Sequence, residues 1–351
     1  MPANEPILSV RDLRTLFPIA QPGLWHSLRR KPMSYVRAVD GVSFDLMPKE
    51  ALAIVGESGC GKSTLALTLM GLERPTSGSI RFGGQELSGA DSTTLKVARR
   101  QMQMVFQDPY ESLNPLMHVG EIVGEPLHVH GLARDAADRS ARVRGAVEAA
   151  GLRPVDTYIN RLPHELSGGQ RQRVAVAAAL VLEPQVLLAD EPVSMLDVSI
   201  RAEILNLLAD LKQERGISIL FITHDLGTVA AVADRIAVMY LGRIVEMGTV
   251  QQVLRDPQHP YTKALLSVVP VPNPRLRRQH IILQGETPDP TRLAPGCRFA
   301  PRCPLAQDAC RTLDPVLKPL ATGHIAGQTA DQSAGQTGEH TIVHEAACIL
   351  V

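Results

Sequence analysis

The sequence lacks an excess of charge of either sign, a long hydrophobic run and a recognisable leader. Lysine plus arginine and aspartate plus glutamate both number 36, so the formal net charge is zero. A protein that binds nucleic acid by neutralising phosphates usually has a basic excess, so this balance argues against nucleic acid as a partner. The longest apolar stretch near a helix, residues 174–182, is far shorter than the ~20 residues that cross a bilayer. Residues 1–6 have no basic or apolar character of a signal peptide. We therefore expect any membrane association to go through partner proteins.

Aromatic residues and cysteines are also few. Aromatic side chains make up 3% of the chain, and there are 5 cysteines. Without a secretion signal, these thiols are expected in a reducing cytosol, where clustered cysteines hold metal more often than they form disulfides. A hydrophobic content of 44% and a charged content of 21% predict a packed globular protein. The length of 351 residues corresponds to about two domains.

A phosphate-binding loop stands out at residues 56–64, which read Gly-Glu-Ser-Gly-Cys-Gly-Lys-Ser-Thr. Residues 51–55 before it are an apolar run of strand length, and residues 64–70 after it favour a helix. Backbone N–H groups of the turn and the positive end of the helix dipole can then cradle a triphosphate. Lys62 would reach the β- and γ-phosphates, Ser63 would ligate Mg²⁺, and Thr64 would add a phosphate hydrogen bond. The alternative, a glycine-rich turn that binds nothing, fits this strand–loop–helix context poorly.

The N-terminal region reads mainly as strands. Residues 7–17 alternate like an edge strand, and residues 36–46 resume strand character. Between them lies a basic, Pro- and Gly-punctuated insertion, residues 18–34, that carries the only tryptophan, Trp25. We interpret it as a solvated loop, with a protein-contact loop as the alternative. Further along, a short strand is expected at 79–82, a helix at 91–101 and a strand at 102–106.

A helical region follows the loop that contains Gln107. Residues 119–151 have helix-compatible spacing, and no strand-like run interrupts residues 120–180. We therefore expect a helical subdomain inserted into an α/β core. His128 and His130 in this region invite a metal-site interpretation, but a lone His-x-His is more often a surface or packing feature.

Two further motifs lie next to buried strands. Residues 166–170, Leu-Ser-Gly-Gly-Gln, open a helix over 171–182, with Ser167 as a natural N-cap and glycine N–H groups open to an anion. The next strand, from residue 186, ends in Asp190 and Glu191, and a strand at 218–223 precedes His224. Ligands in open α/β sheets bind at this carboxyl edge of the strands.

The composition changes after residue 256. Prolines crowd residues 257–304 and cannot easily continue a sheet, so we place a domain boundary between 255 and 256. Residues 320–345 are rich in Ala, Gly, Gln and Thr and are expected to form a flexible loop.

The ordered set of motifs resembles the ATP-binding subunits of ABC transporters over roughly residues 5–255. The motifs at 107–115, 259–265 and 296–304 look like the oligopeptide/dipeptide/nickel importer group. The resemblance implies an α/β fold of the ABC-type P-loop NTPase class: a RecA-like core sheet, an N-terminal antiparallel β-subdomain and an inserted helical subdomain at about 110–180. It divides the chain into an ATP-binding domain at 1–255 and a Pro/Cys-rich C-terminal extension at 256–351.

The resemblance also implies a role for each motif residue. Glu191 would polarise the attacking water and Asp190 would hold Mg²⁺, Gln107 would sense Mg²⁺ and the γ-phosphate, and His224 would touch the γ-phosphate. Phe17 would stack on adenine, with Tyr35 as the alternative. The implied catalytic set is Glu191, His224, Lys62 and Gln107, and the implied Mg²⁺ ligands are Ser63, Gln107 and Asp190. The implied ATP contacts are Phe17, Gly56, Glu57, Ser58, Gly59, Cys60, Gly61, Lys62, Ser63, Thr64, Gln107 and His224.

In this family the remaining motif serves a second subunit. The resemblance implies that residues close over the γ-phosphate of a partner's ATP in a head-to-tail dimer; these are Ser167, Gly168, Gly169, Gln170 and Asp197. It implies a homologous or identical second ATP-binding subunit, two transmembrane permease subunits, an extracytoplasmic substrate-binding protein and a place on the cytoplasmic face of the membrane. Peptide is the expected cargo of the importer, with nickel or another small solute as the alternative.

Apart from Cys60 in the phosphate loop, the cysteines lie in the extension, at Cys297, Cys303, Cys310 and Cys348. Four thiolates suit a [4Fe-4S] cluster or a Cys₄ zinc site. Related importer ATPases carry a similar pattern associated with an iron–sulfur cluster, while zinc and metal-free thiols stay open as alternatives. His344 could replace Cys348 as a ligand if that segment is helical.

Functions other than transport fit the sequence less well than an importer subunit does. A soluble ABC ATPase of translation or DNA repair would need tandem cassettes, a coiled coil or a basic face, and none is visible in the sequence. A metal-sensing regulator that bound nucleotide incidentally would not need Glu191 and the Leu-Ser-Gly-Gly-Gln motif. An exporter subunit is closer to this sequence, but the cysteine-bearing extension argues against it.

Overall fold

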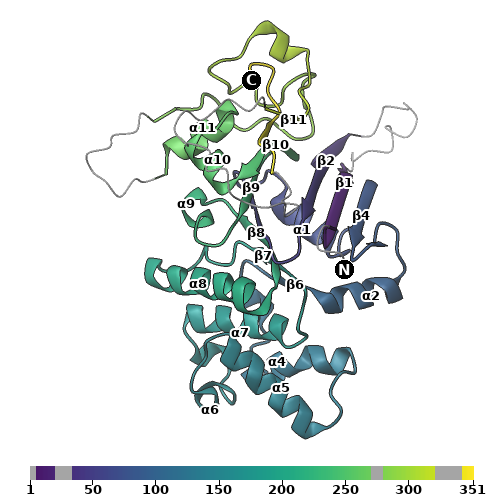
Figure 1. Cartoon of the computed structure of the whole chain (residues 1–351), viewed down its shortest axis with the longest axis vertical. Helices are drawn as coiled ribbons and strands as arrows, with labels where there is room; N and C mark the ends of the chain where they lie inside the picture. The colour runs from purple at the N-terminus through teal and green to yellow at the C-terminus, as the bar shows by residue number, and fades with distance from the viewer. Residues whose placement is uncertain (1–4, 20–33, 270–279, 321–341) are drawn as a thin grey trace, which may run out of the picture.

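The computed structural model describes residues 5–19, 34–269, 280–320 and 342–351. Two sheets and their helices form the body (Figure 1). Most of the insertion predicted at 18–34, with Trp25, lies outside the described residues, as does most of the loop predicted at 320–345. In the described part of the chain, no helix is both long and apolar enough to cross a membrane.

The smaller sheet is antiparallel and has the order β2-β1-β4-β5. Its strands are β1 Leu8–Pro18, β2 Tyr35–Leu46, β4 Ser77–Phe82 and β5 Gln85–Glu86. The prediction that residues 7–17 form an edge strand is wrong, because β1 pairs with β2 on one side and with β4 on the other. Alternating burial tells which face of a strand is covered, and it carries no information about how many neighbours the strand has.

The larger sheet has the order β11-β12-β10-β9-β3-β8-β7-β6. Strands β6, β7, β8, β3 and β9 are parallel, and β10, β12 and β11 continue the sheet in antiparallel fashion. The bounds are β3 Ala51–Val55, β6 Met102–Val105, β7 Val186–Asp190, β8 Ser218–Thr223, β9 Arg235–Tyr240, β10 Arg243–Thr249, β11 Lys318–Pro319 and β12 Glu345–Ala346. Strands β3, β7 and β8 are buried along their whole length, as their continuous apolar runs predict.

Helices flank the larger sheet and form a separate group at one end of the molecule, opposite the C-terminal extension (Figure 1). The described α-helices are α1 Lys62–Leu69, α2 Ser92–Gln101, α3 Pro109–Ser112, α4 Val119–Val129, α5 Ala136–Ala149, α6 Val155–Tyr158, α7 Gly168–Leu180, α8 Val198–Arg215, α9 Leu226–Val229, α10 Val250–Arg255 and α11 Pro260–Ser267. The end group consists of α3 to α7. The region 119–151, predicted to be helical, contains two helices, α4 and α5, and Gly131 with a φ of 61° breaks the run between them.

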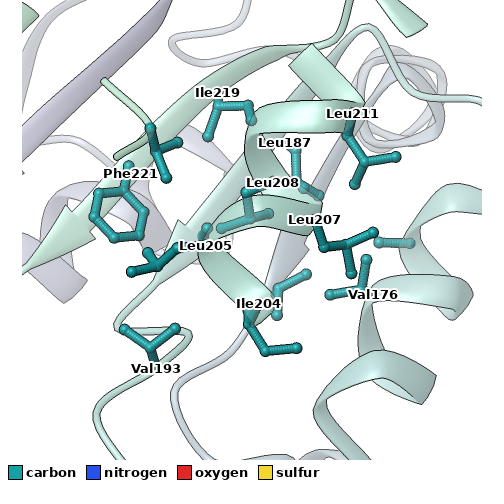
Figure 2. Close-up of a cluster of buried hydrophobic side chains, with 14 of the residues drawn as sticks. Val176, Leu187, Val193, Ile204, Leu205, Leu207, Leu208, Leu211, Ile219 and Phe221 are labelled. Atoms are coloured by element: carbon teal, nitrogen blue, oxygen red, sulfur yellow. The ribbon is translucent and has the colours of Figure 1, made fainter. Parts of the chain in front are cut away.

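The main core lies where α8 packs against β7 and β8 (Figure 2). Ile204, Leu208 and Leu211 lie on one face of α8, and Leu187 and Phe221 face them from the sheet. Full burial of one such side chain contributes about 1.5–3 kcal/mol relative to exposure. This packing fixes the carboxyl ends of β7 and β8, which carry the polar residues of the site.

The C-terminal extension adds two strands to the larger sheet. Strand β12 pairs with β10, through Glu246 with Ala346 and Met247 with Glu345, and β11 pairs with β12. The described residues of 257–304 contain no strand, as their prolines predict, and the sheet resumes only in later residues, at β11 and β12. The boundary between 255 and 256 stays a prediction.

Candidate functional site

The phosphate-binding loop connects β3 to α1, as predicted. Gly61 is the N-cap of α1 with a φ of 107°, and Lys62 is the first residue of the helix. The Lys62 side chain is 4% exposed, and its Nζ donates to the carbonyl oxygens of Gly56 at 2.8 Å and Glu57 at 3.1 Å. A buried ammonium at a helix N-terminus provides a fixed positive charge for an anion.

A cavity of about 540 Å³ opens over this loop, a volume suited to a small organic ligand. Phe17 lies in its wall, whereas the alternative aromatic residue, Tyr35, does not. Gly56, Glu57, Cys60 and His224 lie outside its wall, although the first three belong to the same loop. The lining residues are Phe17, Val36, Arg37, Ala38, Ser58, Gly59, Gly61, Lys62, Ser63, Thr64, Gln107, Glu191, Leu241 and Pro290. Arg37 and Pro290 were not among the predicted contacts.

Glu191 is the point at which the polar residues of the cavity meet. Its carboxylate accepts a hydrogen bond from Gln107 Nε2 at 3.2 Å, lies 3.1 Å from His224 Nδ1, and is 3.8 Å from Lys62 Nζ. Glu191 follows β7 directly and has a φ of 46°, a left-handed conformation that costs a non-glycine residue about 1–3 kcal/mol. The turn directs the carboxylate toward the loop. Four residues that are far apart in the sequence are thus brought together.

Asp190 lies one residue earlier and is 5% exposed. Burial raises the pKa of its carboxyl, and the neighbouring Glu191 adds to this, while a hydrogen bond from Ser63 and the charge of Lys62 oppose it. Its Oδ1 is buried and has no hydrogen-bond partner among the described residues. A buried carboxylate oxygen without a partner, beside a serine hydroxyl, matches the oxygen ligands that Mg²⁺ prefers.

The Leu-Ser-Gly-Gly-Gln segment lies at the N-terminus of α7, outside the wall of the cavity over the phosphate-binding loop. Ser167 Oγ accepts from the Gln170 N–H at 3.3 Å, and Gln170 Oε1 accepts from the Ser167 N–H at 3.0 Å, which forms a capping box. A Cβ at Gly169 would meet Ile200 Cγ2 at 2.3 Å, so glycine allows α7 to approach α8, whose N-cap is Asp197. None of Ser167, Gly168, Gly169, Gln170 and Asp197 lines the cavity over this chain's own loop.

The four cysteines of the extension line one small cavity together with His259 and Phe299. Burial raises the pKa of the Cys297 and Cys303 thiols, and the nearby Cys348 and Cys310 reinforce the shift. Within the described ranges, however, no three His, Cys, Asp or Glu side chains are arranged so that they could hold a metal ion. The thiols thus share a cavity without forming a ligand set in this structure.

The predicted alternative ligand, His344, contacts Glu246 rather than the cysteines. Its Nε2 lies 2.8 Å from Glu246 Oε1, and the segment that follows it is strand β12 rather than a helix. The condition for His344 to replace Cys348 is therefore not met. In the helical group, His128 is exposed in the last turn of α4, and the half-buried His130 caps that helix.

Sequence reasoning missed the contribution of the extension to the site. Pro290 lines the cavity, and Glu57 of the loop is contacted by Tyr261, Thr287 and Arg302. Tyr261 and Arg302 stand within motifs that marked the importer group, but no pattern in the sequence links them to a loop more than 200 residues away.

Comparisons with known proteins identify related sequences. A family model described as "ABC transporter" matches residues 39–194, and one described as "Oligopeptide/dipeptide transporter, C-terminal region" matches residues 245–310. The chain is 46% identical over 322 residues to the dipeptide transport ATP-binding protein DppF of Haemophilus influenzae, which covers 92% of this chain and 96% of that protein. It is also 46% identical over 314 residues to the oligopeptide transport ATP-binding protein OppF of Salmonella typhimurium, covering 89% and 92%.

Solved structures share the fold. The dimeric ATP-binding cassette MJ0796, in a post-hydrolysis state bound to ADP and Pi, matches with a TM-score of 0.60 and 27% identity over 69% of this chain and 98% of that one. The cbiO1 protein of Clostridium perfringens, part of an ABC transporter complex, matches with a TM-score of 0.61 and 30% identity over 72% and 92%.

Proposed function

Since the chain belongs to the family of ABC transporter ATP-binding proteins with an oligopeptide/dipeptide transporter C-terminal region, we propose that it is the ATP-hydrolysing subunit that powers peptide import. The observation that carries this proposal is the convergence of Gln107, His224 and Lys62 on the Glu191 carboxylate beside the cavity. A site that only bound nucleotide would not need a buried carboxylate held by three polar side chains. The curated relatives are transport ATP-binding proteins for dipeptides and oligopeptides.

In the proposed reaction, ATP lies in the cavity with its phosphates on the loop and its adenine against Phe17. Lys62 stabilises the charge on the phosphates, and Gln107 and His224 orient the groups around the γ-phosphate. Glu191 accepts a proton from water as the water oxygen bonds to the γ-phosphorus and the bond to the β–γ bridging oxygen breaks, which leaves ADP and phosphate. A general base of this kind contributes about 10²–10⁴ in rate. Ser63, Gln107 and Asp190 would hold Mg²⁺, which supplies positive charge to the phosphates when bound.

The segment around Ser167 supports a two-subunit arrangement. Because it lies outside this chain's own nucleotide cavity, we propose that it contacts ATP bound to a second ATP-binding subunit, with Asp197 nearby. The solved cassette MJ0796 is described as dimeric. The second subunit is a homologue or another copy of this chain.

The assembly would include two membrane permeases and an extracytoplasmic substrate-binding protein, with this chain on the cytoplasmic face of the membrane. A small-solute importer of the same family, for nickel for example, remains the second candidate because the cargo contacts other subunits. Growth of a deletion strain on defined peptides, compared with uptake of Ni²⁺, distinguishes the two. Co-purification with two polytopic membrane proteins distinguishes both from an ABC ATPase outside transport.

We further propose that Cys297, Cys303, Cys310 and Cys348 hold a [4Fe-4S] cluster, or alternatively zinc. Support comes from the single cavity that all four line, while the absence of a ready ligand set in the described residues means that the thiols would have to move together on binding. Iron and zinc analysis of anaerobically purified protein decides between these groups and metal-free thiols. No step of ATP hydrolysis depends on this group.

The test of the proposed base is Glu191→Gln, which keeps the shape of the side chain but cannot accept the proton. We expect ATP hydrolysis by the assembled transporter to fall by about 10²–10⁴, while ATP still binds and holds the two ATP-binding subunits together. Hydrolysis and subunit association are measured on the same preparation. The matched control is Glu214→Gln, an exposed carboxylate on α8, which should leave both unchanged. Hydrolysis at the normal rate by Glu191→Gln would refute the assignment.

A further inference from the structure

Three residues of the C-terminal extension form hydrogen bonds with Glu57 of the phosphate-binding loop. Arg302 donates to both carboxylate oxygens of Glu57, from Nη1 at 2.8 Å and from Nη2 at 3.3 Å. The Thr287 hydroxyl donates to the same carboxylate at 3.2 Å. Tyr261 completes the contact, because its hydroxyl oxygen accepts the Glu57 backbone N–H at 3.0 Å. Both the side chain and the backbone of Glu57 are thus held by residues from beyond position 255.

The other side of Glu57 faces the residue that binds phosphate. Its carbonyl oxygen accepts from Lys62 Nζ at 3.1 Å, next to the carbonyl of Gly56 at 2.8 Å. Glu57 therefore lies between the extension and Lys62. A displacement of Glu57 moves the oxygen that helps to position the Lys62 ammonium.

In the Arg302–Glu57 ion pair, the arginine is largely shielded from solvent. The Arg302 side chain is 10% exposed and that of Glu57 is 28% exposed. A paired arginine–carboxylate contact has fixed geometry and is stronger than a neutral hydrogen bond, and partial burial reduces screening by salt. The carboxylate also matters to the ligand: left without Arg302, it would be an unpaired negative charge within the loop that cradles phosphates.

We propose that Arg302 is a positioning residue for nucleotide binding, which holds Glu57 so that the loop and Lys62 keep the geometry that accepts phosphates. This inference rests on the proposed function, because it needs ATP to bind the loop. Tyr261 and Thr287 assist by fixing the backbone and side chain of the same residue. The extension is thus part of the nucleotide site.

The first test is Arg302→Gln in the full-length chain, with Mg-ATP affinity measured by titration calorimetry. We expect the Kd to rise by about tenfold, the effect of one charge-assisted hydrogen bond. Arg302→Lys keeps the charge but not the paired geometry and should give an intermediate Kd. The matched control is Asp314→Asn, which breaks another contact between extension and body, the 2.6 Å pair with Arg243, away from the loop. Its Kd should equal that of the wild type.

A double-mutant cycle with Glu57→Gln separates positioning from general damage to the fold. If Arg302 acts through Glu57, Arg302→Gln should change the Kd by less than about twofold when residue 57 is already glutamine. If it merely unfolds the extension, the tenfold loss will persist in that background, and the proposal is wrong. An unchanged Kd in Arg302→Gln alone also overturns it. A wild-type chain that binds no Mg-ATP, or binds it equally well with Lys62→Ala, would instead refute the proposed function.

Discussion

Gly59 and Gly61 of the phosphate-binding loop share a left-handed backbone but have different surroundings. Their φ angles are 80° and 107°, a region that costs other residues about 1–2 kcal/mol. A Cβ at Gly59 would meet nothing within 4 Å, whereas one at Gly61 would lie 1.9 Å from the carbonyl oxygen of Ala38 in β2. We therefore expect Gly59→Ala to lower the free energy of unfolding by about 1–2 kcal/mol and Gly61→Ala by more than about 3 kcal/mol.

Urea unfolding of the two variants measures this difference. Gly59→Ala serves as the control for backbone strain, because it carries the strain without the clash. Equal losses in the two variants would mean that Ala38 moves aside freely, and would contradict the close approach between the loop and β2.

The position of the site residues could be predicted where the chemistry lies in a short motif. Glu191 directly follows an apolar run that predicts a buried strand, and Lys62 lies at the end of the loop that follows another such run, so the sequence places both at one edge of a sheet. Arg302 and Pro290 could not be found in this way. They reach the loop through the folded path of the extension, and a pairing across 245 residues leaves no local pattern.

At the scale of elements, α11 begins at a buried histidine. His259 is 1% exposed, its Nδ1 accepts from the Tyr261 backbone N–H at 3.1 Å, and the His259 backbone N–H donates to the Glu246 carboxylate at 2.9 Å. Burial lowers the pKa of His259 to about 4, with Lys263 adding to this and Glu246 opposing it. Since the folded-state value lies below the ordinary 6.5, the unfolded chain binds more protons between the two values. The stabilisation is complete above pH 6.5 and is lost as the pH falls toward 4.

We expect His259→Asn to remove this acid sensitivity, because asparagine can still cap the helix but does not titrate. Between pH 6.5 and 4 the wild type should lose up to about 3 kcal/mol more unfolding free energy than the variant. Urea midpoints across this range give the difference. The exposed His280, replaced by asparagine, is the control and should follow the wild type. Parallel curves for wild type and His259→Asn would show that His259 does not titrate in this window.

Most elements were predictable because their patterns are local. The apolar runs of β3, β7 and β8 predict strands buried on both faces, and Ser167 as a natural N-cap predicts the start of α7. The neighbours of a strand are set by the rest of the chain. For this reason the interior place of β1 and the addition of β12 to the sheet, across about 100 residues from β10, could not be predicted.

At the scale of the whole molecule, the extension shares its core with the ATP-binding part. Phe299 is 1% exposed and belongs to the main hydrophobic cluster. Its ring lies 5.3 Å from that of Tyr240 in β9 and 5.4 Å from that of Tyr261 in α11. A second connection to the ATP-binding part is the pairing of β12 with β10. With the Arg302–Glu57 contact, these links connect the nucleotide loop, the sheet and the cysteine-bearing segment.

Phe299→Ala tests whether the two parts unfold as one unit. Loss of a fully buried phenylalanine costs about 3–5 kcal/mol of unfolding free energy, so the unfolding midpoint should fall strongly. Leu305→Ala, at 56% exposure in the same segment, should change the unfolding free energy by less than about 0.5 kcal/mol. Because the aromatic cluster spans both parts, the midpoints for loss of Mg-ATP binding and loss of the far-ultraviolet helix signal should shift together. If ATP binding keeps its midpoint in Phe299→Ala, the extension is an independent domain that merely lies against the ATP-binding part.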